Sequence, residues 1–227
     1  MLASAIIPAA GSGKRFGEKK QLKELSGRPL IHYTLTPFLE SSAIDDIVIA
    51  AQKKDFDKLA YVVDSIATEK KISIIEGGDT RQGSISKALA KINSNTKYVC
   101  VHDAARPFVS RELIEKLINA LKTCDAVTVG RKSTDTLKEC TDGIVSRTID
   151  RKKIWQVQTP QAFTKEVIMN AYELAEKQNI SATDDSSLVE EAGYQVNIIN
   201  DSSINFKITT KEDWMMAEAL LRFKKNV

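Results

Sequence analysis

Three glycines and a run of basic residues follow the first apolar segment of the chain. The stretch "IIPAAGSGKRFGEKKQ", residues 6–21, contains Gly11, Gly13 and Gly17, and basic side chains occupy positions 14, 15, 19, 20 and 23. Glycines let backbone N–H groups approach phosphate oxygens closely, and several cations suit a ligand with three or four negative charges. These residue types predict a loop that binds a nucleoside triphosphate, although charge runs are more often solvated surface features.

The spacing within this stretch differs from two familiar phosphate-binding motifs. A P-loop needs a Ser or Thr after its lysine, but Lys14 is followed by Arg15. The dinucleotide fingerprint G-x-G-x-x-G does not fit, because the third glycine, Gly17, stands one residue too late. The second predicted strand is followed by Gln52 and not by the acidic residue that would bind the ribose. The spacing therefore argues against a Walker A loop and against a nicotinamide or flavin cofactor.

A second chemical signal is "VHDAARP", residues 101–107. Asp103 stands at the end of a predicted strand beside small residues, and magnesium binds through one or two carboxylates together with substrate phosphates. We therefore predict that Asp103 binds a magnesium ion. In the simpler interpretation, Asp103 caps a turn and His102 is a buried, hydrogen-bonded histidine. The chain has only two histidines, which gives little support to histidine-based metal or triad chemistry.

The elements that must position these residues follow an alternating pattern. Short segments rich in Val and Ile alternate with amphipathic stretches, which predicts βαβ units and a parallel sheet buried on both faces. The predicted strands are 3–9, 45–51, 71–76, 97–103 and 125–130, and the predicted helices are 29–40, 55–67, 81–92 and 110–122. The fold class is therefore α/β, with a mainly parallel, Rossmann-like twisted sheet and helices on both faces.

The alternation breaks after Gly130. Asp142-Gly143 is a strong turn signal within a Thr-, Val- and Ile-containing stretch, which predicts a protruding β-hairpin arm, an insertion at about 132–154. Beyond the arm we expect a helix over 165–177 and a short helix that begins near Thr183 or Asp184. Strands are predicted at 194–200 and 204–209, and a last helix begins at Thr209 or Thr210. Residues 1–227 are thus predicted to form one domain.

Composition limits the classes of partner. The chain has 33 basic and 30 acidic residues, a net charge of +3, which does not favour a nucleic-acid partner. Cys100, Cys124 and Cys140 are widely spaced and odd in number, so neither a disulfide framework nor a zinc site is indicated. Neither an apolar run near the ~18 residues of a membrane span nor a signal peptide is evident. We expect a cytoplasmic protein without nucleic-acid or membrane partners.

Several motifs in their order along the chain resemble one family, the 2-C-methyl-D-erythritol 4-phosphate cytidylyltransferases of isoprenoid biosynthesis. The motifs are "PAAGSGKRFG", "KQ", "GGDTRQGSI", "VHDAARPF", "DTLK", "TIDRKKIW", "QTPQAF", "TDDSS" and "NFKIT". The resemblance implies that a phosphate oxygen of the polyol phosphate attacks the α-phosphorus of CTP. It further implies that pyrophosphate is released and that the CMP group is transferred to the acceptor. The resemblance also implies a divalent cation, Mg²⁺, and a homodimer in which the arm contributes to the partner's site.

The resemblance assigns roles to individual residues. Arg15 and Lys20 are implied to stabilise the transition state, Asp103 to bind the metal, and Arg151 and Lys207 to hold the acceptor phosphate with help from Thr136. The residues implied to bind the nucleotide are Pro8, Ala9, Ala10, Gly11, Gly13, Gly78, Asp79, Ser84 and Ala104. From the residues alone, Arg151 is equally consistent with an exposed arm residue, and Lys207 with a lysine guarding a strand edge.

Two positions depart from the family pattern, and two alternatives stay open. Lys19 stands where the family usually has proline, so the loop lacks one restraint on φ. Phe206 stands where smaller β-branched residues are common. A ribitol-5-phosphate cytidylyltransferase is the nearest competing function, although "HDAARP" and "PAAG" favour the methylerythritol substrate. A non-catalytic nucleotide-binding module is the alternative from another class, but both Arg151 and Lys207 are present.

Overall fold

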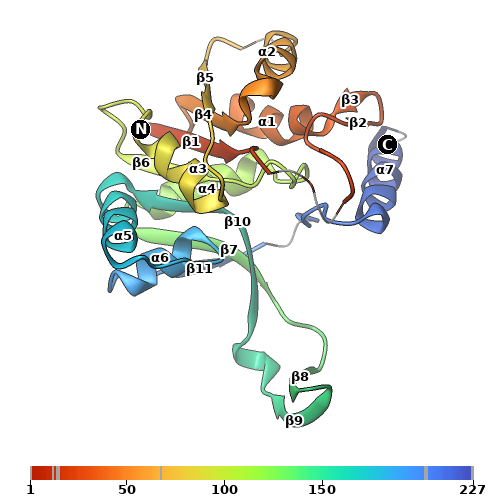
Figure 1. The fold of residues 1–227 in the computed structure, drawn as a ribbon, viewed down its shortest axis with the longest axis vertical. Helices are drawn as coiled ribbons and strands as arrows, with labels where there is room; N and C mark the ends of the chain where they lie inside the picture. Colours follow the sequence, from red (N-terminus) through yellow and green to blue (C-terminus); the bar gives the residue numbers. More distant parts are fainter. Residues whose placement is uncertain (1, 12, 14–15, 67, 202–203, 226–227) are drawn as a thin grey trace.

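The computed structural model describes residues 2–11, 13, 16–66, 68–201 and 204–225. The body of the protein is built on one seven-stranded sheet (Figure 1). The strands stand in the order β11-β7-β10-β6-β1-β4-β5. Their bounds are β1 Ala3–Pro8, β4 Asp46–Ala51, β5 Lys71–Glu76, β6 Tyr98–Val101, β7 Ala126–Lys132, β10 Trp155–Thr164 and β11 Asn197–Asn200. All the pairings are parallel except those of β10, so the predicted mainly parallel α/β sheet is confirmed.

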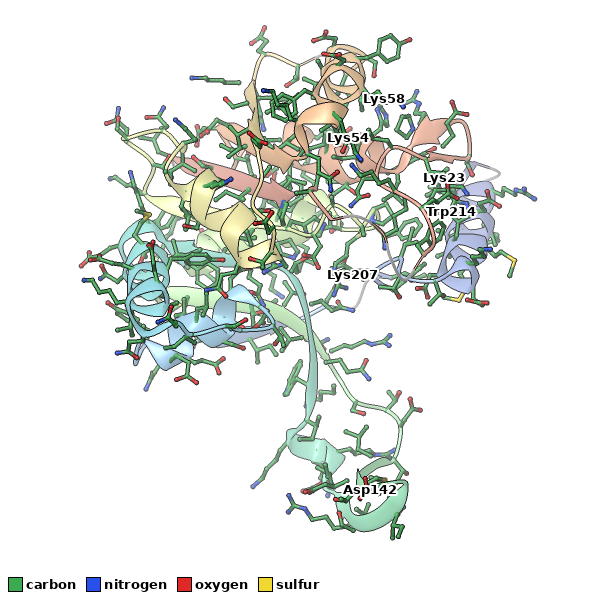
Figure 2. The ribbon with its side chains drawn as sticks, in the orientation of Figure 1. Lys23, Lys54, Lys58, Asp142, Lys207 and Trp214 are labelled. Carbon is green, nitrogen blue, oxygen red and sulfur yellow. The ribbon has the colours of Figure 1, made fainter. Side chains whose placement is uncertain are left out.

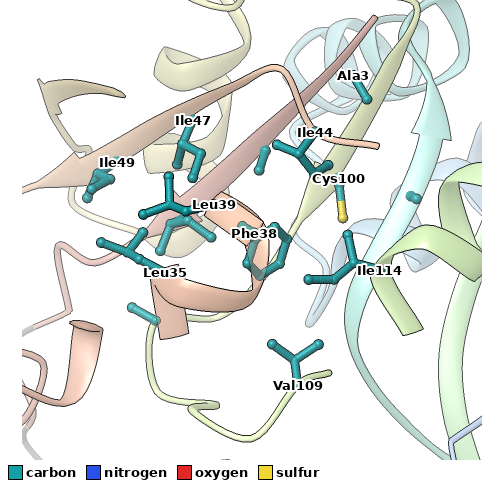
Figure 3. Close-up of a cluster of buried hydrophobic side chains, with 14 of the residues drawn as sticks. Ala3, Leu35, Phe38, Leu39, Ile44, Ile47, Ile49, Cys100, Val109 and Ile114 are labelled. Carbon is teal, nitrogen blue, oxygen red and sulfur yellow. The ribbon is translucent and has the colours of Figure 1, made fainter. Parts of the chain in front are cut away.

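Helices cover both faces of this sheet. One face carries α1 (Leu30–Glu40), α2 (Phe56–Asp64, entered through the short 3-10 helix η1, Lys53–Asp55) and α4 (Arg111–Ala120). The other carries α3 (Arg81–Leu89), α5 (Lys165–Gln178) and α6 (Asp185–Glu191). Alternate residues of β1 contribute to both cores. Ile7 belongs to the cluster that includes Phe38 of α1, part of which Figure 3 shows, and Ile6 belongs to the cluster on the α3 and α5 side. A strand buried on both faces explains the unbroken apolar run in its sequence.

β10 is the element that the sequence did not reveal. We predicted an arm at about 132–154 and no strand between it and the helix over 165–177, but β10 continues from the arm into the middle of the sheet and pairs antiparallel with both β6 and β7. Pro160 and the glutamines of this stretch argue against a central strand, because proline cannot donate a ladder hydrogen bond. The register shift between Gln158 and Gln161 accommodates the proline.

The arm projects from the body as an isolated hairpin of β8 (Leu137–Thr141) and β9 (Ile144–Ile149), followed by the 3-10 turn η2 (Arg151–Lys153) (Figure 1). Asp142 and Gly143 both have positive φ, +51° and +81°, as the predicted two-residue turn requires. Within the described residues, β8 and β9 form a sheet of their own, separate from the central one. The predicted hairpin is therefore present.

The C-terminal region differs from prediction at one segment. Residues 204–209 are not a strand, so the interpretation of Lys207 as a strand-edge guard is wrong. Helix α7 (Lys211–Lys225) begins as expected, because Asp213 accepts the N–H groups of Thr209 and Thr210 while Thr210 Oγ1 accepts that of Asp213. A small hairpin, β2 (Glu24–Leu25) and β3 (Arg28–Pro29), precedes α1. Across the described ranges, none of the helices combines the length and apolar character needed to cross a membrane.

Candidate active site

A cleft of about 630 Å³ lies at the carboxyl ends of β1, β4 and β6. This is the edge of an open α/β sheet where ligands usually bind, and the volume is in the range of small-molecule sites. The cleft gathers many of the residues singled out in the sequence, namely Pro8, Ala10, Gly11, Gly13, Lys20, Gly78, Asp79, Ser84, Asp103, Ala104 and Lys207. Residues separated by up to two hundred positions in the chain therefore meet at one site.

Four of the predicted site residues are not placed in this cleft. Ala9 is 6% exposed and packs in the core beside α1 instead. Thr136 and Arg151 lie on the arm, where a guanidinium N–H of Arg151 donates to the carbonyl oxygen of Thr134. Arg15 lies outside the described residues. Of the four basic residues that the resemblance implies as catalytic or acceptor-binding, Lys20 and Lys207 are the ones that the described part of the chain places in the cleft.

The glycine-rich loop, residues 11–21, turns on Gly13. The carbonyl oxygen of Gly13 accepts the N–H groups of Phe16 and Gly17 at 2.9 and 3.0 Å. Gly13 has φ of +72°, and a Cβ atom at this position would lie 1.9 Å from the carbonyl oxygen of Glu18. Because both the backbone conformation and the contact exclude a side chain, glycine is required here for the turn itself.

Helix α7 holds the outer side of this loop. The Phe16 ring packs against Trp214 with centroids 5.4 Å apart, and Lys23 Nζ lies 5.4 and 5.3 Å from the Phe16 and Trp214 ring centroids. Lys23 also pairs with Glu18, and Figure 2 places Lys23 and Trp214 together next to α7. Lys23 is thus occupied with aromatic and acidic neighbours, in the manner of a cation–π contact, and stabilises the loop from outside the cleft.

A second loop, residues 76–80, forms the opposite wall. Ser84 Oγ accepts the N–H of Gly78 at 3.0 Å and donates to the carbonyl oxygen of Thr80 at 2.9 Å. Thr80 in turn caps α3 by accepting the N–H of Gly83. A Cβ atom on Gly77 would lie 2.6 Å from that of Ala10, so the two loops pack closely through small residues. The backbone of both walls is therefore held in place before any ligand binds.

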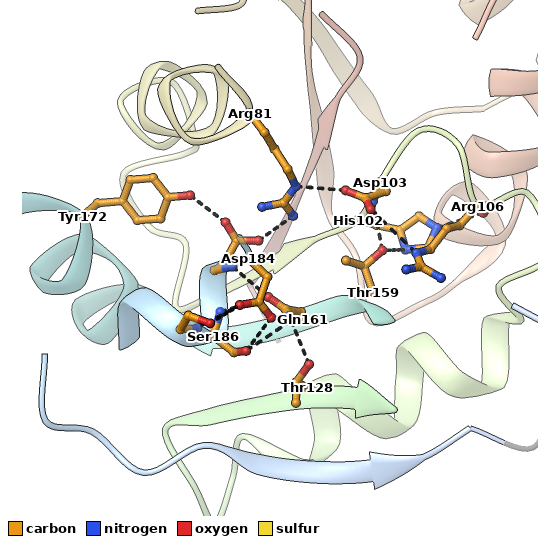
Figure 4. Close-up of polar contacts among 12 residues, drawn as sticks. Arg81, His102, Asp103, Arg106, Thr128, Thr159, Gln161, Tyr172, Asp184 and Ser186 are labelled. Atoms are coloured by element: carbon orange, nitrogen blue, oxygen red, sulfur yellow. Dashed lines mark hydrogen bonds and ion pairs between the residues drawn. The ribbon is translucent and has the colours of Figure 1, made fainter. Parts of the chain in front are cut away.

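Asp103 is the electrostatic centre of the cleft (Figure 4). Its carboxylate accepts from Arg81 Nε at 3.0 Å and from Lys207 Nζ at 2.8 Å, and Arg106 Nε lies 3.7 Å away. Burial alone would raise the pKa of Asp103, but Arg81, Lys207 and Arg106 together lower it well below its usual range. Asp103 is therefore an anion at neutral pH, and it orients Arg81 and Lys207, which line the cleft.

Arg81 is a site residue that our sequence reasoning missed. Its guanidinium joins Asp103 to Asp185 of α6, with Nη2 2.7 Å from the Asp185 carboxylate, and the hydroxyl of Tyr172 donates to Asp185 at 2.6 Å. Burial lowers the pKa of Arg81, but Asp185 and Asp103 raise it further than burial lowers it. Arg81 lies within the quoted motif "GGDTRQGSI", but its partners are 22 and 104 residues away, so no local pattern identifies them.

Gln161 explains why two of the quoted motifs lie together. Its carbonyl oxygen accepts the N–H groups of Asp185 and Ser186, and its amide donates to Thr128 and Asp184 (Figure 4). This places the start of α6, and with it Asp185, against β10. The motifs "QTPQAF" and "TDDSS" therefore act on the cleft indirectly, by fixing the carboxylate that holds Arg81.

His102 is a buried, neutral imidazole, as the simpler of the two sequence interpretations has it. The hydrogen-bond network assigns its tautomer: Nε2–H donates to the carbonyl oxygen of Arg106, and Nδ1 accepts from the Thr159 hydroxyl. Thr159 accepts the N–H of Asp103. Burial lowers the pKa of His102 to about 4. The imidazole therefore stays neutral at physiological pH and fixes the backbone around Asp103.

The donor set around Asp103 can be tested against a magnesium ion. Within the described residues, no group of three or more His, Cys, Asp or Glu side chains could hold a metal ion. Magnesium commonly keeps one or two carboxylates and takes its other ligands from phosphates and water. Asp103 is ionised and lines the cleft, so it fits a magnesium ion that arrives with a nucleotide and does not fit a cation held by protein ligands alone.

The chain is similar to known proteins over nearly its whole length. The family model described as 2-C-methyl-D-erythritol 4-phosphate cytidylyltransferase matches residues 3–223. The enzyme of that name from Clostridioides difficile is 40% identical over 98% of this chain and 94% of its own length. The enzyme of that name from Bacillus licheniformis is 39% identical over 97% and 96%.

Solved structures agree with these matches. A 4-diphosphocytidyl-2C-methyl-D-erythritol synthase from Anaerococcus prevotii superimposes with a TM-score of 0.87 at 35% identity, covering 97% of this chain and 98% of its own. The 2-C-methyl-D-erythritol 4-phosphate cytidylyltransferase from Thermus thermophilus superimposes with a TM-score of 0.81 at 31% identity, covering 98% and 100%. The likeness therefore includes the sheet, the cleft and the segments that line it.

Proposed function

Since the chain belongs to the 2-C-methyl-D-erythritol 4-phosphate cytidylyltransferase family, we propose that its reaction takes place in the cleft beside the glycine-rich loop. The chain is a cytidylyltransferase that transfers CMP from CTP to 2-C-methyl-D-erythritol 4-phosphate in isoprenoid biosynthesis. The products are 4-diphosphocytidyl-2-C-methyl-D-erythritol and pyrophosphate. The observation that supports this location is the meeting of Gly13, Lys20, Asp103 and Lys207 around one cleft.

The bond changes define what the residues must do. An oxygen of the acceptor phosphate bonds to the α-phosphorus of CTP, while the bond from that phosphorus to the β-phosphate oxygen breaks and pyrophosphate leaves. Two anions must approach each other and charge builds on the α-phosphate, so catalysis depends on positioning and on prearranged positive charge. Lys20 is 8% exposed and lines the cleft, which suits a charge held in place for the transition state. Arg15 is proposed as its companion.

Lys207 is proposed to hold the acceptor phosphate. Without substrate it donates to Asp103 at 2.8 Å, and its side chain is 34% exposed, so it can exchange the carboxylate for a phosphate by a small movement. Figure 2 shows Lys207 at the side of the body from which the arm projects. A protein that only binds a nucleotide would not need a cation for an acceptor phosphate. The presence of Lys207 beside Asp103 therefore favours an enzyme over a non-catalytic module.

Magnesium is proposed as the cofactor, with Asp103 as its protein ligand. A bound magnesium ion would supply positive charge that offsets the charge of the triphosphate. Asp103 itself is kept ionised by Arg81 and Lys207 and is fixed by the Thr159 hydroxyl, which accepts the Asp103 N–H at 3.0 Å. Its contribution is thus an oriented carboxylate at the floor of the cleft.

A homodimer is proposed because the second acceptor-binding cation, Arg151, lies on the arm with Thr136. Figure 1 shows the arm pointing away from the body, and Ile144 and Val145 at its hairpin are 75% and 54% exposed. A partner subunit that covers these side chains would bring its own Arg151 to this cleft. We propose the cytoplasm as the location, since all three cysteines are free thiols.

One assay tests the substrate and the cofactor together. The purified protein is given CTP and Mg²⁺ with either 2-C-methyl-D-erythritol 4-phosphate or ribitol 5-phosphate, and pyrophosphate release is measured. We expect turnover with the methylerythritol phosphate, none without an acceptor, and loss of turnover when EDTA removes the metal. Turnover with ribitol 5-phosphate alone would contradict the substrate, and CTP binding without turnover on either acceptor would favour a non-catalytic module.

A mixing experiment tests the shared site. Arg151→Ala alone should raise the KM for the acceptor much more than that for CTP, because the arm contacts only the acceptor. Arg151→Ala has an intact cleft and Lys20→Met an intact arm, so subunit exchange between them creates one wild-type site in each mixed dimer. We expect the mixture to recover about a quarter of wild-type activity, since half of randomly mixed dimers are heterodimers with one of two sites intact. No recovery above the separate variants would show that each arm serves its own cleft.

A further inference from the structure

Lys19 does not line the cleft, whereas its neighbour Lys20 does. Its Nζ donates to Asp55 Oδ2 at 2.5 Å and to Gln52 Oε1 at 2.6 Å. The two charged side chains are 23% and 12% exposed, so the ion pair is largely shielded from solvent. Asp55 closes η1 and precedes α2, so Lys19 ties the loop to the segment after β4 and its charge is already neutralised.

The amide of Gln52 connects the two ends of the same loop. Its Nε2 donates to the carbonyl oxygen of Ala10 at 2.8 Å, while its Oε1 accepts from Lys19. Both atoms belong to one planar group, so the chain entering the loop and the chain leaving it are held at a fixed separation. The backbone of Gln52 is fixed because Gln52 directly follows β4 in the central sheet. The end of β4 is bonded to the segment after β1, since the carbonyl oxygen of Ala50 accepts the N–H of Ala9 at 2.7 Å.

The backbone of Lys19 is also packed against the turn. A Cβ atom on Gly13 would lie 3.3 Å from Lys19 Cα, so these two backbone segments are in close contact. A displacement of Lys19 would therefore displace Gly13 and the adjacent Lys20, which lines the cleft. The contacts of one side chain outside the cleft thus control the position of groups inside it.

We propose that Lys19, Gln52 and Asp55 form a latch that positions the glycine-rich loop for CTP. This inference rests on the proposed function, because the loop must bind CTP for its position to matter. The three are positioning residues: they hold the backbone at Ala10 and Gly13 and the side chain of Lys20 in the arrangement that the triphosphate requires. Lys19 acts through Asp55 and Gln52 and does not contact the triphosphate.

The test separates a latch from a direct contact between Lys19 and CTP. Asp55→Asn and Lys19→Met should each weaken CTP binding on the order of tenfold by calorimetry, the range expected for one charge-assisted hydrogen bond. The double variant should be little worse than either single variant, because both remove the same interaction. The KM for the acceptor should stay within about twofold of wild type. Amide hydrogen exchange over residues 9–21 should become faster in parallel.

Proline at position 19 is the informative replacement. Lys19 does not have positive φ, and its N–H donates no hydrogen bond to another described residue, so proline fits and restrains φ without any charge. We expect Lys19→Pro to keep CTP affinity within about threefold of wild type and to make the additional change Asp55→Asn harmless. Asp57→Asn and Lys54→Met are matched controls, since both residues are exposed and adjoin the latch.

Each other outcome has a distinct meaning. If Asp55→Asn leaves CTP binding unchanged or tighter while Lys19→Pro weakens it, Lys19 acts directly on the triphosphate and the latch is wrong. If wild type binds and turns over CTP but neither Asp55→Asn nor Lys19→Met changes affinity or hydrogen exchange, the latch is wrong and the proposed function stands. A wild-type protein that does not bind CTP would overturn both.

Discussion

Replacing Arg81 by methionine is expected to lower the free energy of unfolding by about 3–5 kcal/mol, the usual cost of removing one partner from a buried ion pair. Asp185 is fully buried and would keep only the Tyr172 hydroxyl among the side-chain contacts described here, and Asp103 would lose its partner at 3.0 Å. The methionine side chain preserves most of the apolar volume, so the loss reports the charge. Urea unfolding of the two proteins at neutral pH measures it.

A surface arginine gives the matched control. Arg111 pairs with Glu115 at 3.5 Å, and its side chain is half exposed, so Arg111→Met should change stability by less than about 1 kcal/mol. A double variant, Arg81→Met with Asp185→Asn, should lose less than the sum of the two single changes, since the second change removes the carboxylate that the first left unpaired. If Arg81→Met and Arg111→Met lower the free energy of unfolding equally, the buried ion pairs of Arg81 with Asp103 and Asp185 contribute no more stability than a surface pair.

Lys20→Met is expected to lower kcat by about 10²–10³-fold, the cost of removing one prearranged donor from a transition state. The KM for CTP should change far less, because the other groups proposed to bind the nucleotide, in the rest of the loop and in the 76–80 loop, are unchanged. Thermal unfolding should be nearly unchanged, which separates the loss from misfolding. Steady-state kinetics at saturating CTP and acceptor measure the effect.

Lys23→Met is the control for this substitution. It removes the same charge three residues away, but Lys23 lies outside the cleft between Phe16, Trp214 and Glu18. We expect its kcat to fall by less than about tenfold. A fall equal to that of Lys20→Met would mean that both lysines act through the total charge of the loop, and Lys20 would then have no special place at the α-phosphate.

The sequence predicted the elements whose patterns are local. The β1, β4, β5 and β6 strands, the helices between them, and the Asp142-Gly143 hairpin all follow from periodicity and turn chemistry within short windows. β10 could not be predicted, because Pro160 and the glutamines fit a central strand only through a register shift that depends on β7. Residues 204–209 have the composition of a strand but lack strand partners among the described residues, since Ile208 N–H bonds to Ala105.

The sequence predicted several residues that line the cleft, but not the residues that support them. Gly13, Lys20, Asp103 and Lys207 carry types and motifs that point to phosphate chemistry. Arg81, Gln161 and Asp185 act by tertiary contacts between segments that are far apart in sequence, which no spacing rule reveals. Lys19 is the instructive case: its type suggested a further cation for the triphosphate, but its ammonium group binds Asp55 and Gln52, and Lys19 itself does not line the cleft.

The reversed strand β10 has a consequence for the order in which the protein forms as it is synthesised. One edge of β6 pairs with β1, which precedes it in the chain, but the other edge pairs with β10, which is synthesised later. The ion-pair partner of Asp103, Lys207, lies 104 residues later in the chain. The ribosome needs about 5–20 s to synthesise a segment of that length. The nascent chain therefore carries a half-sheet with an unpaired edge and an acidic cleft floor lacking Lys207, and synthesis of the C-terminal segment completes both.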